Sequence, residues 1–367
     1  MNRRVSLPIV LTASIVIVMT ISNITTATFV FNLHVSLLTN FGYASNLNES
    51  IINNNGKPSS SSSSLFRAGE LYVGNAISNS VSVVDLSTNQ VIENISVGDS
   101  PHDIKISDDQ QIVYTTDTDS GTISIINASS KSLIDQIKTN VTALHGIAIR
   151  NDTLYAGDVY GGRVLVIKGG QIIDQIKVGS GPEYIEISPD GRFMYVANLW
   201  SPISVVDLRD GNKVIKSIDS GITPHGLSFN KNGSRLFIVN MHSNTLSVID
   251  SQKHEIIKTI SVGDRPEYVK LTPDEKFAYV TNLGSGTVSK VDENTIEVID
   301  EIHIGDTKGP HGIAFSPGGN LMYISNMNGN DITVVDTSAD KIVANINAGG
   351  IEPHQIIMRE PSVRIGS

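Results

Sequence analysis

The sequence predicts an all-β fold in which seven four-stranded antiparallel sheets close into a ring, a seven-bladed β-propeller. One phrase recurs about every forty residues: an apolar residue, Tyr or Phe, two small or β-branched residues, then Asn or Asp. The intervening chain alternates apolar and polar residues over short stretches, and no helical periodicity is long enough to connect parallel strands. The seven phrases are Leu71–Asn75, Val113–Asp117, Leu154–Asp158, Met194–Asn198, Leu236–Asn240, Ala278–Asn282 and Met322–Asn326.

Each repeat unit contains four short strands, as the unit that begins at Pro224 illustrates. Its alternation predicts strands at His225–Phe229, Arg235–Asn240, Thr245–Asp250 and Glu255–Gly263, separated by turn residues. Short strands joined by tight turns pair with their neighbours as antiparallel meanders. Such a unit cannot bury its apolar faces alone, so we expect the units to stack around a common axis.

The number of blades follows from the two ends of the repeat region. Glu70–Val97 supplies three strands of one unit, and Pro353–Met358 supplies only the first strand of a unit. Placing the C-terminal strand innermost in that blade closes the ring and leaves no exposed edge. Together with this split blade, six complete units give seven blades; they begin at Pro101, Leu144, Pro182, Pro224, Pro266 and Pro310.

The repeat phrase also carries a family resemblance. Tyr-Val-Thr-Asn is spelled out at Tyr279–Asn282, and a Ser-Pro-Asp-Gly turn stands at Ser188–Gly191. In these motifs the chain resembles the YVTN-repeat β-propeller family over its whole repeat region. The resemblance implies an exported protein of bacterial or archaeal surface-layer type. It implies no particular activity, because propellers host unrelated functions.

The N-terminus predicts export. Arg3 and Arg4 precede an uncharged, mostly apolar run from Val5 to Ile21, the order of a basic and an apolar region in a signal sequence. The run is also close to the shortest membrane span, so residues 1–42 are either a signal peptide or a membrane anchor. Residues 43–67 are rich in Asn and Ser and predict a flexible linker. The propeller at 68–362 is then extracellular, secreted or anchored outside the membrane.

Composition excludes several classes of function. The formal net charge of −10 and the absence of a basic stripe argue against nucleic-acid binding. The chain has no cysteine, which excludes disulfides, thiol catalysis, cysteine-bound zinc and iron–sulfur clusters. Motifs of serine hydrolases, P-loop proteins, zinc proteases and EF-hands are also absent from the sequence.

The position after the residue that opens each unit, a proline in all units but the one at Leu144, is here called the opening slot and holds the candidate site. Five of the nine histidines occupy it, and the two remaining occupants are glutamates. Because the slot lies where one blade passes to the next, the repeat gathers its residues into a circle around the central channel. The seven residues are His102, His145, Glu183, His225, Glu267, His311 and His354.

The favoured interpretation of the opening slot is structural. In WD40-type propellers a histidine at this link bonds an aspartate of the neighbouring turn. The same pairing here would join His102 to Asp117 and His145 to Asp158, with no ligand involved. By the same pattern Glu183 would face Asn198, and Glu267 would face Asn282.

The alternative interpretation is a metal site, in which a subset of the opening-slot residues binds copper or zinc. Pro-His-Gly runs such as His225-Gly226 are similar to the copper-cluster propeller of nitrous-oxide reductase. That enzyme also needs cysteine ligands, which this chain lacks. Streptogramin-lyase-like propellers, which use a His, a Glu and magnesium, are similar in their strand openings. That resemblance would pair Glu183 or Glu267 with His225.

A weaker set of candidates lies in the turns between second and third strands, on the same face. Tyr160, Trp200 and His242 occupy these turns and would cap a ligand there or pack between loops. Tyr184 and Tyr268 follow the two glutamates, where they would either line the channel or pack between blades. The sequence therefore predicts an extracellular or cell-surface binding or scaffold module for an unknown protein, polysaccharide or small ligand. The alternative is a metal-binding propeller enzyme, oxidoreductase-like or lyase-like.

Overall fold

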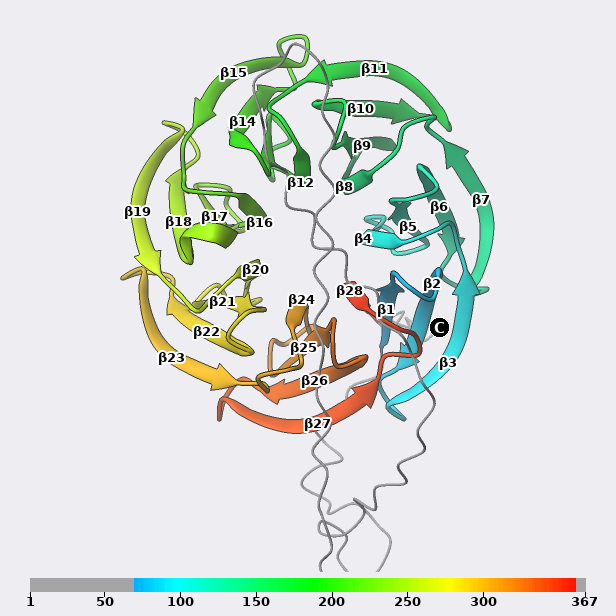
Figure 1. Ribbon diagram of the computed structural model, residues 1–367, viewed down its shortest axis with the longest axis vertical. Coiled ribbons are helices and arrows are strands. Elements are labelled where there is room, and N and C mark those ends of the chain that lie inside the picture. The colour runs from blue at the N-terminus through cyan, green and yellow to red at the C-terminus, as the bar shows by residue number, and fades with distance from the viewer. Residues whose placement is uncertain (1–68, 361–367) are drawn as a thin grey trace, which may run out of the picture. The chain divides into compact units, whose positions relative to one another are not determined.

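The computed structural model describes residues 69–360, and this part of the chain is all-β apart from one short 3-10 turn, η1 (Met241–Ser243). Seven four-stranded antiparallel sheets surround a central axis (Figure 1). The predicted fold class and blade number are confirmed. The predicted signal or anchor at 1–42 and the linker at 43–67 lie outside the described residues. Within residues 69–360 no helix is long and apolar enough to cross a bilayer.

The strands fall into four concentric sets (Figure 1). The innermost set is β28 (Pro353–Arg359), β4 (Pro101–Ile106), β8 (Leu144–Arg150), β12 (Pro182–Ile187), β16 (Pro224–Phe229), β20 (Pro266–Leu271) and β24 (Pro310–Phe315). The second set, which carries the repeat phrase, is β1 (Glu70–Asn75), β5 (Ile112–Asp117), β9 (Thr153–Asp158), β13 (Phe193–Asn198), β17 (Arg235–Asn240), β21 (Phe277–Asn282) and β25 (Leu321–Asn326).

The third and outermost sets complete each blade. The third set is β2 (Ser80–Asp85), β6 (Thr122–Asn127), β10 (Arg163–Lys168), β14 (Ser201–Asp207), β18 (Thr245–Asp250), β22 (Thr287–Asp292) and β26 (Asp331–Asp336). The outermost set is β3 (Gln90–Ser96), β7 (Ser132–Lys138), β11 (Gln171–Lys177), β15 (Lys213–Ile218), β19 (Glu255–Ser261), β23 (Glu297–His303) and β27 (Lys341–Asn347).

The ring closes as the sequence predicts. The first blade has the strand order β28-β1-β2-β3, so the C-terminal strand is the innermost strand beside the N-terminal three. Its register places Leu71 opposite Met358 and Val73 opposite Ile356. Arg359 at the end of β28 contacts Glu70 at 2.8 Å. The split blade thus joins the two ends of the repeat region in one sheet.

The tyrosine of the repeat phrase joins neighbouring blades. The Tyr72 hydroxyl donates to the carbonyl of Ala128 in the next blade at 2.8 Å, and the Tyr195 hydroxyl donates to that of Ser251 at 3.2 Å. Both rings are fully buried between the sheets. An aromatic ring that fills the inter-sheet space and also bonds the next blade explains why Tyr recurs at this position.

Candidate functional site

The seven opening-slot residues converge at one end of the channel, where the innermost strands begin. All except His145 are at least nine-tenths buried, and the His145 side chain is 19% exposed. We call this set the axial cluster: His102, His145, Glu183, His225, Glu267, His311 and His354.

A β-bulge turns the opening slot toward the axis. In every innermost strand the pairing register with the second strand shifts just after the first residue, for example between Pro101 and Ile104 and between Pro310 and Ile313. A bulge interrupts the alternation of side chains between the two faces of a sheet and redirects the residue within it. The aliphatic residues after the bulge return to the inter-blade core, whereas the opening slot faces the channel.

Glycines beside three of the histidines allow the innermost strands to approach closely. A Cβ at Gly146 would lie 2.4 Å from the carbonyl oxygen of Glu183, and a Cβ at Gly226 would lie 2.5 Å from that of Glu267. A Cβ at Gly312 would meet the next strand at 2.8 Å. The close packing of consecutive blades at the axis therefore requires a glycine after each of these three histidines.

Four histidines form an imidazole-rich arc. The ring centroid of His102 lies 4.2 Å from that of His145, 4.7 Å from that of His354 and 6.1 Å from that of His311. Burial, reinforced by the neighbouring imidazoles, holds the pKa values of His102 and His311 well below the usual range. These two rings are therefore neutral at physiological pH and can offer nitrogen lone pairs to a metal.

The remaining three residues form a charged arc. His225 lies between two carboxylates, with Nε2 3.6 Å from Glu183 Oε1 and Nδ1 3.3 Å from Glu267 Oε2. Burial disfavours its charge, but the two glutamates outweigh burial and raise the pKa of His225 to about 9. Burial likewise opposes ionisation of Glu183, but His145 and His225 lower its pKa to about 2. The arc is a buried carboxylate–imidazolium–carboxylate chain.

His145 connects the two arcs. Its Nδ1 donates a hydrogen bond to Glu183 Oε1 at 2.7 Å, and its ring stacks on that of His102. This bond fixes the tautomer and leaves Nε2 of His145 as a free acceptor. The second oxygen of the carboxylate, Glu183 Oε2, is buried and has no hydrogen-bond partner among the described residues.

Three further atoms of the cluster are buried without a partner in the described part of the chain: the Nδ1 atoms of His102, His311 and His354. These three histidines form a group whose possible ligand atoms all lie within 4.8 Å of one another. A second group that meets the same limit joins His102 to His145 and Glu183. His102 belongs to both groups, so an ion held by either group would have His102 as a ligand.

The pairings that the structural interpretation predicted for the opening-slot histidines are not formed. Asp117 accepts hydrogen bonds from Thr122 and Ser124 of β6, both at 2.7 Å, and makes none to His102. Asp158 pairs with Arg163 at 2.8 Å and not with His145.

The two Asn partners expected for the glutamates also bind within their own blades. Asn198 donates to Ser204, and Asn282 donates to Thr287 and Ser289, whereas Glu183 and Glu267 contact histidines. The Asn/Asp series ties the second strand to the third, and the bulge carries the opening slot away from it.

The candidates in the surface turns are only partly brought together. The rings of Tyr160 and Trp200 are nearly parallel at 14°, with centroids 6.4 Å apart, and both side chains are exposed. His242 lies in η1 and contacts Thr223 through Nδ1 at 2.8 Å. The structure thus forms an exposed aromatic pair from two adjacent blades, without His242.

Tyr184 lies in the channel directly beneath the axial cluster. Its ring contacts His225 with centroids 4.8 Å apart, and its hydroxyl accepts a hydrogen bond from Gln355 Nε2 at 3.0 Å. Gln355 is on β28 and Tyr184 is on β12, so this hydrogen bond crosses the channel. Gln355 was not among the sequence candidates, because a Gln next to His354 carries no signal of a partner 171 residues away.

Comparison with protein families gives one match. The model of the family described as "Lactonase, 7-bladed beta-propeller" matches residues 172–348. The matched region includes four members of the axial cluster and excludes His102, His145 and His354. This match agrees with the fold and points to a different propeller family from the YVTN repeats. No curated protein sequence matches the chain.

Solved structures share the fold at low sequence identity. Hydrazine synthase of Kuenenia stuttgartiensis is 19% identical with a TM-score of 0.62, over 72% of this chain and 96% of that one. A protein of unknown function from Desulfotomaculum acetoxidans is 15% identical with a TM-score of 0.68, over 81% and 100%. A candidate 6-phosphogluconolactonase from Bacteroides fragilis is 17% identical with a TM-score of 0.66, over 83% and 100%. Similarity at this level shows the propeller fold alone.

Proposed function

We propose that this propeller binds one transition-metal ion, copper or zinc, in the axial cluster. The observation that supports the proposal is the convergence of three buried imidazoles whose Nδ1 atoms have no partner among the described residues, those of His102, His311 and His354. Imidazole nitrogen is a good ligand for both metals, and no cysteine is present to select a softer site.

Energetics favours a bound ion over an empty cluster. Each buried polar atom without a partner costs about 1–3 kcal/mol, and three such Nδ1 atoms belong to the histidines of this group. Ligands of a tetrahedral zinc ion with bonds of about 2.1 Å lie about 3.4 Å apart. The ligand atoms of His102, His311 and His354 are already within 4.8 Å of one another, so small side-chain rotations complete the geometry.

His145 and Glu183 form with His102 the second group that could hold the ion. A carboxylate that accepts from one imidazole nitrogen and leaves the other free is the usual support of a metal-binding histidine. The bond from His145 Nδ1 to Glu183 has this form. The carboxylates of Glu183 and Glu267 also offset the positive charge of the ion. His225 lies between them and neutralises part of their negative charge.

Elemental analysis of the full chain, purified without a histidine tag and dialysed against copper or zinc, tests the proposal. We expect about one ion per chain in the wild type, and loss of that ion in H102A and H311A. His303 is exposed and lies outside the cluster, so H303A is the matched control and should retain the ion. Circular dichroism checks that each variant is folded. Wild-type protein without stoichiometric metal, or H311A that retains it, would overturn the proposal.

A second candidate function is hydrolysis of a lactone. Two observations favour it: the family match at residues 172–348, and the free oxygen of Glu183 beside the metal-ligating histidines. In this reaction the oxygen of water adds to the lactone carbonyl and the ring C–O bond breaks. One proton of the water passes to the departing ring oxygen, which leaves as an alcohol, and the Glu183 carboxylate would orient the water by accepting a hydrogen bond from it.

Lactone hydrolysis is measured as acid release from δ-gluconolactone or 6-phosphogluconolactone, corrected for spontaneous opening. We expect E183Q to lose the activity at least a hundredfold while keeping its fold, and E255Q, on the exposed outer strand β19, to keep the activity. Acid release by E183Q at the wild-type rate would refute this candidate. The metal site would then stand on the elemental analysis alone.

Export remains part of the proposal. The order of Arg3, Arg4 and the apolar run to Ile21 supports a propeller that works outside the cell. In that setting the channel-mouth face is the surface that would meet a protein, polysaccharide or small ligand. Fractionation of cells that express the full chain tests this: we expect propeller accessible to added protease in intact cells, and protection would contradict it.

A further inference from the structure

The end of the channel opposite the axial cluster contains a cavity of about 170 Å³. The innermost strands line it three residues after the opening slot, about 10 Å further along each strand. Lys105, Glu186 and Lys270 occupy these positions on β4, β12 and β20. Gln355, which donates a hydrogen bond to Tyr184, lines this cavity, and none of the axial-cluster residues does.

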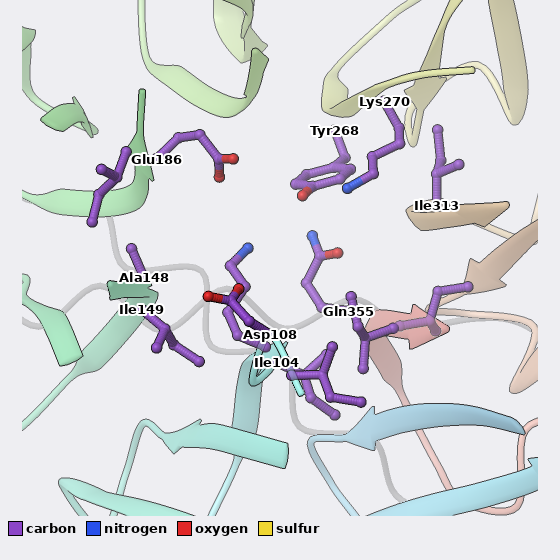
Figure 2. A pocket seen from close by; sticks show the side chains of 14 residues that line it. Ile104, Asp108, Ala148, Ile149, Glu186, Tyr268, Lys270, Ile313 and Gln355 are labelled. Carbon is purple, nitrogen blue, oxygen red and sulfur yellow. The ribbon is translucent and has the colours of Figure 1, made fainter. Parts of the chain in front are cut away.

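The groups at this cavity are mostly hydrogen-bond donors directed at one space. Figure 2 shows the side chains of Glu186, Tyr268, Lys270 and Gln355 extending toward a common centre. Tyr268 is only 5% exposed as a residue and lines the cavity, and no hydrogen bond joins its hydroxyl to another described residue. The hydroxyl is therefore available to a ligand in the cavity.

The lysines differ in how they are neutralised. Lys105 lies 3.7 Å from the buried carboxylate of Asp103, which outweighs the effect of burial and raises the lysine pKa. Lys270 is partly buried and forms no salt bridge with any described residue, although Glu186 is close enough to interact with it electrostatically. The cavity therefore has one lysine ammonium group outside any direct ion pair of the described residues.

The acidic groups limit the charge of a ligand. Glu186 and Asp108 also line the cavity. Burial raises the pKa of Glu186, and Lys105 and Lys270 oppose this only in part. Two carboxyl groups close to the ligand disfavour a dianion such as phosphate and tolerate a single negative charge. Glu186 is also placed to accept a hydrogen bond from a hydroxyl of the ligand.

We propose that this cavity binds a small monocarboxylate, with Lys270 and the Tyr268 hydroxyl as the groups that recognise its carboxylate. Gln355 donates to Tyr184 through one hydrogen of its amide and has the second available for the same ligand. The three donors come from β20 and β28, on different sides of the channel, so only the closed ring assembles them.

Saturation-transfer NMR titrations of the full chain with acetate, lactate and inorganic phosphate test this inference. We expect saturable binding of acetate or lactate, weakened at least tenfold in K270M and in Y268F. Lys168 is exposed at the end of β10, away from the cavity lining, so K168M is the control and should bind as the wild type does. Y268F removes only the hydroxyl, which separates loss of recognition from loss of fold. Phosphate binding in place of carboxylate, or acetate and lactate binding unchanged in K270M, would overturn the proposal.

Discussion

Replacing Asp117 by Asn should raise the free energy of unfolding at neutral pH. Asp117 ends β5 and is fully buried, with Oδ2 accepting from Thr122 and Ser124 and Oδ1 without a partner among the described residues. Burial raises its pKa from 3.8 to about 6, against the opposing effect of those two hydrogen bonds. The folded protein therefore carries an unfavourable buried charge at pH 7.

The sign and size of the effect follow from the two pKa values. Between pH 3.8 and about 6 the folded protein binds a proton that the unfolded chain has released, so wild-type stability falls as pH rises. A shift of about two pKa units corresponds to about 3 kcal/mol, complete above pH 6 and absent below pH 3.8. An uncharged residue with the same hydrogen bonds would not bear this cost.

Asparagine fits the position because other blades use it. Asn282, the equivalent residue of β21, donates through Nδ2 to Thr287 at 3.1 Å and to Ser289 at 2.9 Å. Thr122 and Ser124 stand at the same spacing from Asp117, and their hydroxyls can accept as well as donate. We therefore expect D117N to be more stable than wild type by about 2–3 kcal/mol at pH 7.5.

Urea denaturation followed by circular dichroism between pH 4 and pH 8 measures this difference. The gap between D117N and wild type should grow from near zero at pH 4 to its full value above pH 7. D158N is the matched control: Asp158 is paired with Arg163 at 2.8 Å, so its loss should destabilise the fold. A D117N variant no more stable than wild type at pH 7.5, or a gap that does not change with pH, would refute the reasoning.

Three further predictions concern the construction of the channel. Deleting residues after Gly350 removes β28 and exposes the edge of β1. The truncated chain should therefore aggregate, or melt well below the wild-type temperature in a thermal scan. An unchanged melting temperature would contradict closure of the ring by β28. G226A should lower the free energy of unfolding, measured by urea denaturation, by about 1–3 kcal/mol, because its Cβ would lie 2.5 Å from the Glu267 carbonyl oxygen. G74A is the control and should keep the wild-type stability, because a Cβ there has no contact under 3.6 Å. Y184F removes the hydrogen bond to Gln355 and should lower the free energy of unfolding by about 1 kcal/mol in the same assay. Stability equal to that of the wild type would show that this bond does not stabilise the fold.

The sequence predicted the fold and the membership of the axial cluster, because both depend on periodicity. Each blade repeats the same strand lengths, and the opening slot recurs in all of them, so the spacing of His102 and His311 along the chain is enough to place them on one circle. The split blade closed by Pro353–Met358 was likewise predictable from counting strands.

The direction of the cluster was not predictable, because a bulge decides it. Alternation along β24 places His311 on the same side as Ile313, yet the register shift between Pro310 and Ile313 turns the histidine to the channel. The partner of Tyr184 is Gln355, 171 residues away, and no local pattern marks such a contact. The Lys270 cavity depends on single residues that the repeat does not share, so periodicity gives no sign of it.

X-ray absorption spectroscopy of the zinc-loaded full chain tests the central claim, metal binding by the axial cluster, most directly. If His102, His311 and His354 bind the ion as proposed, we expect a first shell with three imidazole nitrogens at about 2.0–2.1 Å, one ion per chain. In H102A the imidazole signal should fall, because His102 belongs to both possible ligand groups. A shell of oxygen atoms alone, or the same imidazole shell in H102A as in the wild type, would contradict the claim.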